Sequence, residues 1–328
     1  MANLFELLNN GMDFAWKAFI RPVRMKYSER DLGPEFFEVQ DTPVRRKDFT
    51  VLNNRRQELK CSLYYPTEAT SFPCVVYLHG NSGNRLEAKP LINELLPRKI
   101  ALCSLDFAGS GISDGQFISL GWQEAKDLKL VVRKLRKRKK IKEIALWGRS
   151  MGAVTALLYT GRYDRKISGM VLDSPFSSLR RLALEHIAEK SGMPDFMNSS
   201  VYSYIQAKVK ENAHFDMCRV EPVDYLTSSV PAVFITGLKD GVVGKHHVVR
   251  LFNKFRGAKC LAKLRSAGHN SSRPPELQAD IMRFLAHTFG RRKFVGFKMI
   301  SISTFPTVKK GSVEAAPKAT CLVRRYKR

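Results

Sequence analysis

Short apolar runs alternate with helical patterns between residues 46 and 290 of this 328-residue chain. Runs such as 74–79 (CVVYLH) and 143–147 (EIALW) are almost continuously apolar, which is typical of strands buried on both faces. We predict strands at 47–52, 58–65, 74–79, 100–105, 143–147, 168–173, 232–236 and 259–264, and helices near 86–96, 122–138, 150–161, 245–256 and 274–289. Two leading strands without a helix between them, followed by strand–helix alternation, predict an α/β fold. Its sheet should be mostly parallel, with an antiparallel edge.

Three segments fall outside this alternation and suggest the domain organisation. Residues 177–228 are longer than an ordinary connection, so we predict a cap-like insertion over the carboxyl ends of the strands. We predict that residues 1–45 form an N-terminal amphipathic helix and a lead-in, and that residues 291–328 form a basic, flexible tail. The helix, at about 4–20, is expected to pack on its own domain, with the surface of a membrane as the alternative.

Composition is ordinary for a globular protein, with 44% hydrophobic and 26% charged residues, and it excludes disorder for most of the chain. The net charge of +26 is less ordinary, and it is local. Residues 291–328 hold eleven basic residues against Glu314, and residues 133–142 hold eight basic residues. Such runs are usually solvated faces, and attraction to an anionic membrane surface is the main alternative. Too few aromatic residues accompany them to favour nucleic acid.

Cysteine spacing and the N-terminal residues bear on the compartment. Six cysteines are widely spaced and form no C-x-x-C pair, which fits a reducing environment. Polar residues interrupt the stretch MANLFELLNNGMDFAWKAFI, so it does not look like a secretory signal. We therefore expect a cytoplasmic protein, with peripheral attachment to the cytosolic face of a membrane as the alternative. The oligomeric state stays open.

The most informative residues are Gly148-Arg149-Ser150-Met151-Gly152, a G-x-S-x-G motif between a predicted strand and a predicted helix. In that context the serine sits on a sharp backbone turn that projects its hydroxyl out of the sheet. Glycines two residues to either side are needed because side chains there would collide with neighbouring backbone. Ser150 is therefore the predicted nucleophile.

A serine hydroxyl needs a base that is oriented by an acid, and in this context the chain order is Ser, acid, His. His269 follows the last predicted strand and is the predicted base. Asp240, after the seventh predicted strand, is the favoured acid, and Asp173, after the sixth, is the alternative.

The chemistry also requires two backbone N–H groups aimed at the developing oxyanion. We predict that one comes from Met151, directly after the nucleophile. The other comes from Asn81 in the glycine-containing loop HGNSGN at 79–84.

The segments YLHGNSGNR, LDFAGSGISDG, WGRSMGAV, DSPFSSL, ITGLKDGVV and GHNSSRP occur in an order and spacing similar to those of the α/β-hydrolase superfamily. From about residue 50 to 289 the chain resembles its eukaryotic serine hydrolases related to serine aminopeptidases and protein depalmitoylases. The resemblance implies an eight-stranded sheet, a Ser150–Asp240–His269 triad and neither metal nor organic cofactor. Zinc motifs, a phosphate-binding loop and a dinucleotide fingerprint are indeed missing from the sequence.

We therefore expect a serine hydrolase acting on a small or lipid-linked acyl ester or thioester. An aminopeptidase-like hydrolase is the first alternative, and it would need a carboxylate for the substrate amine, from Glu185, Glu189, Asp195 or Glu211. The second alternative is a catalytically silent member of the fold that docks on a membrane or partner. The sequence offers no account of Arg149, next to the nucleophile.

Overall fold

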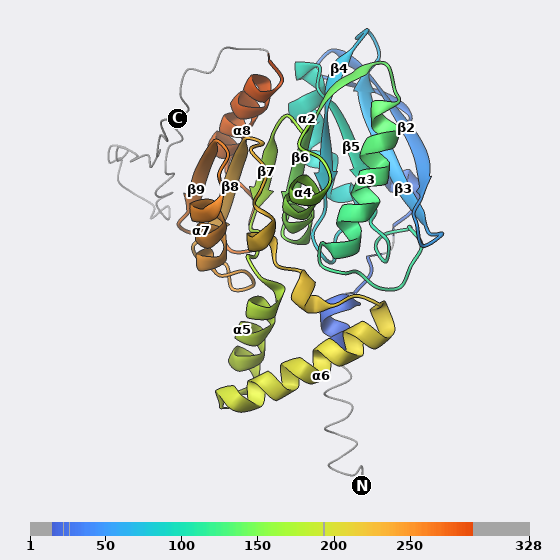
Figure 1. Ribbon diagram of the computed structural model, residues 1–328. Coiled ribbons are helices and arrows are strands. Elements are labelled where there is room, and N and C mark those ends of the chain that lie inside the picture. Colours follow the sequence, from blue (N-terminus) through green and yellow to red (C-terminus); the bar gives the residue numbers. More distant parts are fainter. Residues whose placement is uncertain (1–14, 22, 26, 193, 291–328) are drawn as a thin grey trace, which may run out of the picture.

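A nine-stranded mixed sheet runs through the described part of the chain, which in this computed structural model comprises residues 15–21, 23–25, 27–192 and 194–290 (Figure 1). The strand order is β1-β2-β3-β5-β4-β6-β7-β8-β9. The strands are β1 (Phe36–Val39), β2 (Thr42–Leu52), β3 (Glu58–Pro66), β4 (Phe72–Leu78), β5 (Ala101–Leu105), β6 (Ile141–Arg149), β7 (Met170–Asp173), β8 (Ala232–Gly237) and β9 (Lys259–Leu264). β5, β4 and β6 to β9 are parallel, and β1 to β3 are antiparallel. The predicted α/β class is confirmed.

Helices cover both faces of the sheet and enclose two apolar cores (Figure 1). The α-helices are α2 (Ile92–Leu95), α3 (Trp122–Arg136), α4 (Met151–Arg162), α5 (Leu179–Ser191), α6 (Asp195–Ala213), α7 (Lys245–Lys254) and α8 (Pro275–Thr288). The 3-10 turns are η1 (Glu29–Leu32), η2 (Arg85–Leu91), η3 (Leu96–Arg98), η4 (Met217–Arg219) and η5 (Pro222–Tyr225). One core takes buried residues of α3, α4 and α7, and the other takes those of α2 and α8. These two cores hold the ends of the strands in place, and with them the site.

The sheet starts earlier than the sequence predicted, so the described part has nine strands instead of eight. β1 was missed because it is a four-residue edge strand with three of its four positions at least partly exposed. A tight turn with positive φ at Gln40 and Asp41 leads into β2. β2 itself begins at Thr42, before the predicted start at 47, because its first residues, TPVRR, contain no continuous apolar run that hydropathy would mark.

The N-terminal lead-in is part of the folded domain. Residues 15–20 are helical, and Trp16 and Ile20 are buried in the core of α3 and α4. The Arg24 guanidinium donates to the carbonyl oxygens of Gly111, at 2.6 Å, and Gly115, at 3.0 Å. The described part of this segment therefore supports packing on its own domain, while residues 4–14 of the predicted helix lie outside the described residues.

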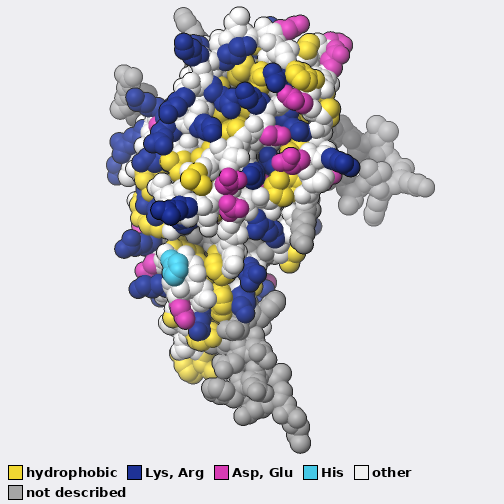
Figure 2. Space-filling model, turned by 90° about the vertical axis from the view of Figure 1, so that its right-hand side faces the viewer, with side chains coloured by type: hydrophobic (Ala, Val, Ile, Leu, Met, Phe, Trp, Pro, Cys, Tyr) yellow, Lys and Arg dark blue, Asp and Glu magenta, His cyan; other side chains and the backbone are white. Residues whose placement is uncertain are grey.

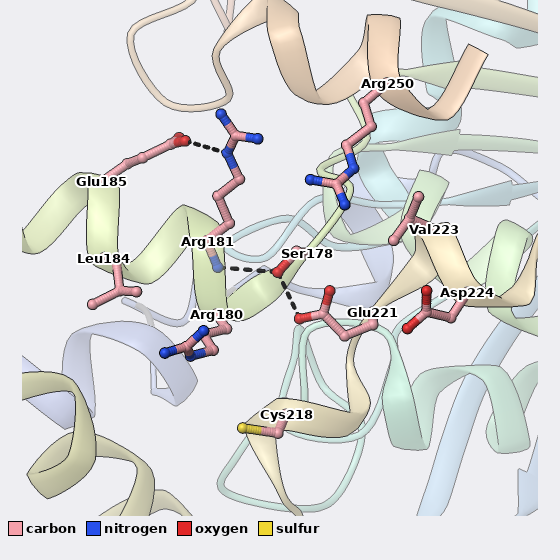
Figure 3. Close-up of a pocket in the computed structure, with 10 residues that line it drawn as sticks. All are labelled: Ser178, Arg180, Arg181, Leu184, Glu185, Cys218, Glu221, Val223, Asp224 and Arg250. Atoms are coloured by element: carbon pink, nitrogen blue, oxygen red, sulfur yellow. Dashed lines mark hydrogen bonds and ion pairs between the residues drawn. The ribbon is translucent and has the colours of Figure 1, made fainter. Parts of the chain in front are cut away.

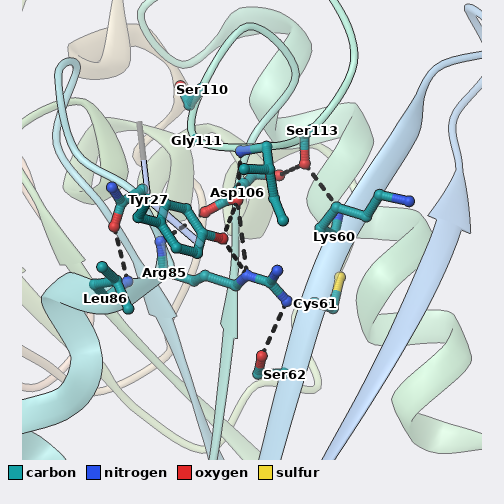
Figure 4. A network of polar contacts seen from close by, with 12 residues as sticks. Tyr27, Lys60, Cys61, Ser62, Arg85, Leu86, Asp106, Ser110, Gly111 and Ser113 are labelled. Atoms are coloured by element: carbon teal, nitrogen blue, oxygen red, sulfur yellow. Dashed lines mark hydrogen bonds and ion pairs between the residues drawn. The ribbon is translucent and has the colours of Figure 1, made fainter. Parts of the chain in front are cut away.

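A buried polar network fixes the loops that follow β4 and β5 (Figure 4). The Asp106 carboxylate, fully buried, accepts from the main chain of Arg85 at 2.7 Å and from the hydroxyl of Tyr27 at 2.6 Å. The Arg85 guanidinium, also buried, donates to Tyr27 and to the hydroxyl of Ser62. Because buried charges are stable only when paired and hydrogen-bonded, these side chains form one interdependent unit.

The segment predicted as a cap lies between β7 and β8 and comprises α5, α6, η4 and η5. In Figure 1, α5 and α6 extend beyond the carboxyl ends of the parallel strands. The two ends of the segment are hydrogen-bonded to each other, from Leu179 N to Val220 O at 2.9 Å and from Val223 N to Ser177 O at 3.2 Å. The segment thus leaves and re-enters the domain at one place.

Many Lys and Arg side chains lie on the face of the molecule that Figure 2 shows. Most of the basic residues of 133–142, at the end of α3 and the start of β6, are exposed, which fits a solvated face. The basic tail, 291–328, lies outside the described residues. Within the described residues, no helix is both long enough and apolar enough to cross a bilayer.

Candidate active site

Ser150 occupies the sharp turn between β6 and α4 that the motif predicts. Its backbone has φ 50° and ψ −117°, a conformation that non-glycine residues rarely adopt and that costs about 1–3 kcal/mol. The turn is held by a hydrogen bond from Ser150 N to the carbonyl of Asp173, at 2.7 Å. A strained serine kept in place by its surroundings is typical of functional sites.

The two glycines of the motif allow this turn to lie close to the sheet. A Cβ atom at Gly152 would overlap the carbonyl oxygen of Leu78 in β4, and one at Gly148 would overlap the carbonyl of Gly152. Neither contact can be relieved by a side-chain movement, because both neighbours are backbone. The glycines are thus required by packing of α4 on β4 and β6.

His269 and Asp240 are brought together, although 29 residues separate them in the chain. His269 Nδ1 lies 2.8 Å from Asp240 Oδ2, and the Asp240 side chain is fully buried. Burial alone would raise the pKa of Asp240, but the hydrogen bond from His269 and those from the Val243 and Val242 amides hold it below its ordinary value. Asp240 therefore stays ionised and keeps the imidazole proton on Nδ1.

Asp173, the alternative acid, is engaged elsewhere. Its two carboxylate oxygens accept from Nη2 and Nε of Arg273, at 2.7 and 2.8 Å. Both side chains are nearly buried. A carboxylate paired bidentately in this way is already satisfied, and the imidazole of His269 has Asp240 as its partner. The geometry favours Asp240 as the acid.

The proposed oxyanion residues lie on the two sides of the serine. Met151 is the first residue of α4, where main-chain N–H groups have no partner within the helix. Asn81 is exposed in the loop after β4, and a Cβ atom on its neighbour Gly80 would lie 3.9 Å from that of Ser150. The buried His79 ring anchors this loop, because its Nε2 accepts from Phe107 N at 3.1 Å. This anchoring role was missed in the sequence.

One cluster, Glu185, His246 and His247, has the composition of a metal site. His247 Nδ1 accepts from the main-chain N–H of Ser177 at 3.2 Å, so its proton is on Nε2, which faces Glu185 at 3.0 Å. A metal ligand would need that Nε2 lone pair, and its other ring nitrogen would have to donate a proton instead of accepting one. Burial also lowers the pKa of His247 to about 4, which keeps the ring neutral. The arrangement suits a hydrogen-bonded link between α5 and α7 better than a metal.

A cavity of about 590 Å³ opens between the cap and α7 (Figure 3). Arg181 reaches it from α5 and Arg250 from α7, with Glu221 nearby. Its lining is Ser178, Arg180, Arg181, Leu184, Glu185, Cys218, Glu221, Val223, Asp224 and Arg250. Arginines and carboxylates balance one another there, and none of the predicted catalytic residues lines it. The lining of the cavity thus carries no net charge.

The depressed pKa of Asp240 predicts how stability depends on pH. The Asp240–His269 contact should stabilise the fold fully above the unfolded-state pKa, about 3.9, and lose its effect as pH falls through the lower folded-state pKa. Melting temperatures of the parent and Asp240→Asn should therefore differ at pH 6–7 and converge in acid. The exposed Asp41→Asn variant serves as control. A gap between parent and Asp240→Asn that is constant from pH 7 to pH 3 would contradict the assignment.

Residues 70–217 match the model of a family described as serine aminopeptidase, S33. The uncharacterized protein YqkD of Bacillus subtilis is 25% identical over 201 residues, which are 60% of this chain and 65% of that protein. The uncharacterized protein YfhR of Salmonella typhi is 31% identical over 185 residues, which are 53% of this chain and 60% of that protein. The chain thus spans less than two thirds of these relatives, and the predicted eukaryotic branch stays a prediction.

Solved structures share the fold over most of the chain. The Pyrococcus furiosus esterase Pf2001 superposes with a TM-score of 0.60 at 22% identity and covers 81% of this chain and 97% of its own. Acetyl xylan esterase 1 from a Thermoanaerobacterium species gives a TM-score of 0.60 at 15% identity, over 86% of this chain and 94% of its own. At these identities the likeness shows the fold. Together with the family match and the strand–serine–helix turn, it shows that the chain has an α/β-hydrolase fold.

Proposed function

We propose that the protein is a serine hydrolase that cleaves an acyl ester or thioester through Ser150, His269 and Asp240. One observation carries the proposal. The strained Ser150 adjoins Arg149, whose guanidinium bonds the main chain of His269 at 2.8 Å, and the imidazole of His269 is in turn bonded to the buried Asp240. Because Ser150, Asp240 and His269 follow the carboxyl ends of β6, β8 and β9, these contacts support the proposal of a nucleophile, a base and an acid at one edge of the sheet.

The geometry supports a two-step acyl transfer. His269 takes the proton of the Ser150 hydroxyl on Nε2 as the oxygen attacks the carbonyl carbon, while Nδ1–H donates to Asp240. The amides of Met151 and Asn81 then stabilise the oxyanion, and the start of α4 contributes the positive end of its dipole. His269 passes the proton to the leaving alcohol or thiol. Water, activated by the same imidazole, releases the acid and restores Ser150.

The contacts of the cap favour an ester or thioester over the aminopeptidase alternative. Glu185 is engaged by Arg181, His246 and His247. Glu211 pairs with Lys208 at 3.2 Å. Glu189 is exposed and lies 3.9 Å from His186. None of these three carboxylates is a buried, unpaired group that a substrate ammonium would need, and the side chain of Asp195 lies outside the described residues.

Active-site labelling followed by a substrate panel tests the proposal. A fluorophosphonate probe should modify the folded parent protein, and peptide mapping by mass spectrometry should place the modification on Ser150. The panel compares p-nitrophenyl acyl esters, acyl thioesters and aminoacyl arylamides, and turnover is expected with the first two. Modification of a different serine, or none, would contradict the catalytic assignment. Turnover of arylamides alone would replace the substrate class but leave the triad in place.

A further inference from the structure

The loop that carries His269 has no regular structure of its own. It spans residues 265–274 between β9 and α8, and Asn270, Ser271 and Ser272 are exposed. The imidazole is fixed at Nδ1 by Asp240, but one side-chain hydrogen bond does not fix the main chain that bears it. Lys239 N donates to Ala267 O at 3.1 Å, and two arginines add contacts at Gly268 and His269 themselves.

The first contact comes from the residue next to the nucleophile. Arg149 ends β6, and its Nη2 donates to the carbonyl oxygen of His269 at 2.8 Å and to the side chain of Asn270 at 3.3 Å. Such charge-assisted hydrogen bonds are shorter and stronger than neutral ones. The strand that carries Ser150 thereby holds the main chain of His269 directly, across 120 positions of sequence.

The second contact is made by Arg273, a residue of the loop itself that is paired with Asp173 at the end of β7. Arg273, paired bidentately with Asp173, also donates to the carbonyl oxygens of Gly268 at 3.2 Å and His269 at 3.3 Å. Asp173 ends β7, and its own carbonyl accepts the main-chain N–H of Ser150. The ion pair is about nine-tenths buried, so the loop is tied to the strand that also anchors the nucleophile's turn.

We infer that Arg149 and the Asp173–Arg273 pair are positioning residues, which hold the His269 main chain so that its imidazole faces Ser150. The inference rests on the proposed function. It adds a role for Asp173, which was the alternative acid, and for Arg149, the residue before the serine in the G-x-S-x-G motif. None of the three side chains touches the reacting atoms in this arrangement. They act through the carbonyl oxygens of Gly268 and His269.

Arg149 offers the cleaner test, because Asp173→Asn or Arg273→Met leaves a nearly buried charge unpaired and can unfold the protein. The rate of fluorophosphonate labelling should fall in Arg149→Ala by at least about tenfold, since a displacement of 1 Å costs about 10²-fold. The melting temperature should stay near that of the parent. Arg149→Lys should recover part of the rate, because its ammonium group can donate to the same carbonyl oxygen but lacks the planar guanidinium that holds Nη2 in place. Arg265→Ala, at an exposed arginine of the same loop, is the matched control.

Chemical rescue separates positioning from a general structural role. Millimolar guanidinium should restore labelling of Arg149→Ala, relative to sodium at equal ionic strength, and should not restore it in Ser150→Ala. Parental labelling of Arg149→Ala, or a slow rate that guanidinium leaves unchanged, would overturn the inference while the proposed function stood. Absence of labelling in the parent protein would overturn the proposed function, and with it this inference.

Discussion

Replacement of Ser150 by alanine is expected to lower kcat on the best ester or thioester by a factor on the order of 10⁶, with little change in KM. The reason is that the covalent route is lost altogether, while the proposed main-chain donors of Met151 and Asn81 would still bind the substrate carbonyl. His269→Ala should cost about as much, because an unassisted hydroxyl is a weak nucleophile. The measurement is steady-state hydrolysis, with burst kinetics to detect the acyl-enzyme.

Ser82→Ala is the matched control for this prediction, because it removes an exposed hydroxyl from the loop that faces Ser150. It should retain parental kcat. Ser150→Ala should not destabilise the fold, because the turn is held by a main-chain hydrogen bond and the lost hydroxyl is only partly buried. Hydrolysis by Ser150→Ala within tenfold of the parent would rule out this serine as the nucleophile.

The largest expected effect on stability comes from the buried network of Arg85, Asp106 and Tyr27. Arg85→Met should lower the free energy of unfolding by about 3–5 kcal/mol, because it leaves the fully buried Asp106 carboxylate without its positive neighbour. The lost hydrogen bonds to Tyr27 and Ser62 add to the same effect (Figure 4). Urea unfolding at neutral pH, followed by circular dichroism, measures the change.

Two controls sharpen this second prediction. The same substitution at Arg45, whose partner Glu35 is exposed, should change stability little, because exposed ion pairs are screened by water. The double variant Arg85→Met/Asp106→Asn should be less destabilised than the sum of its two single variants, since removal of both charges leaves neither uncompensated. Equal effects at positions 85 and 45 would show that the buried pair has no special weight.

Most of the fold could be predicted, because its strands and its serine turn are marked by residues that are neighbours in the sequence. Continuous apolar runs identified the buried parallel strands, and the strand–serine–helix context identified the turn at Ser150. Chain order then suggested His269 and Asp240, and the two side chains lie within hydrogen-bonding distance. Local patterns fail at the exposed edge, where β1 has no continuous apolar run to mark it.

Long-range contacts account for what the sequence could not predict. Arg149 bonds the carbonyl oxygen of His269, 120 positions away in the chain, and Arg273 pairs with Asp173, 100 positions away. No spacing rule reports such side-chain to main-chain bonds. The choice between Asp173 and Asp240 likewise depended on which arginine or histidine each carboxylate meets. The tie from Arg24 and Tyr27 to the loops after β4 and β5 has the same character.

The joined ends of the segment between β7 and β8 have a consequence for engineering. Because Leu179 meets Val220, and Ser177 meets Val223, a replacement segment could enter and leave the domain at this one stem. It would have to supply apolar residues in place of those that α5 and α6 contribute to the core. A chimaera that carries the corresponding segment of a relative is accordingly the natural starting point for engineering selectivity in this scaffold.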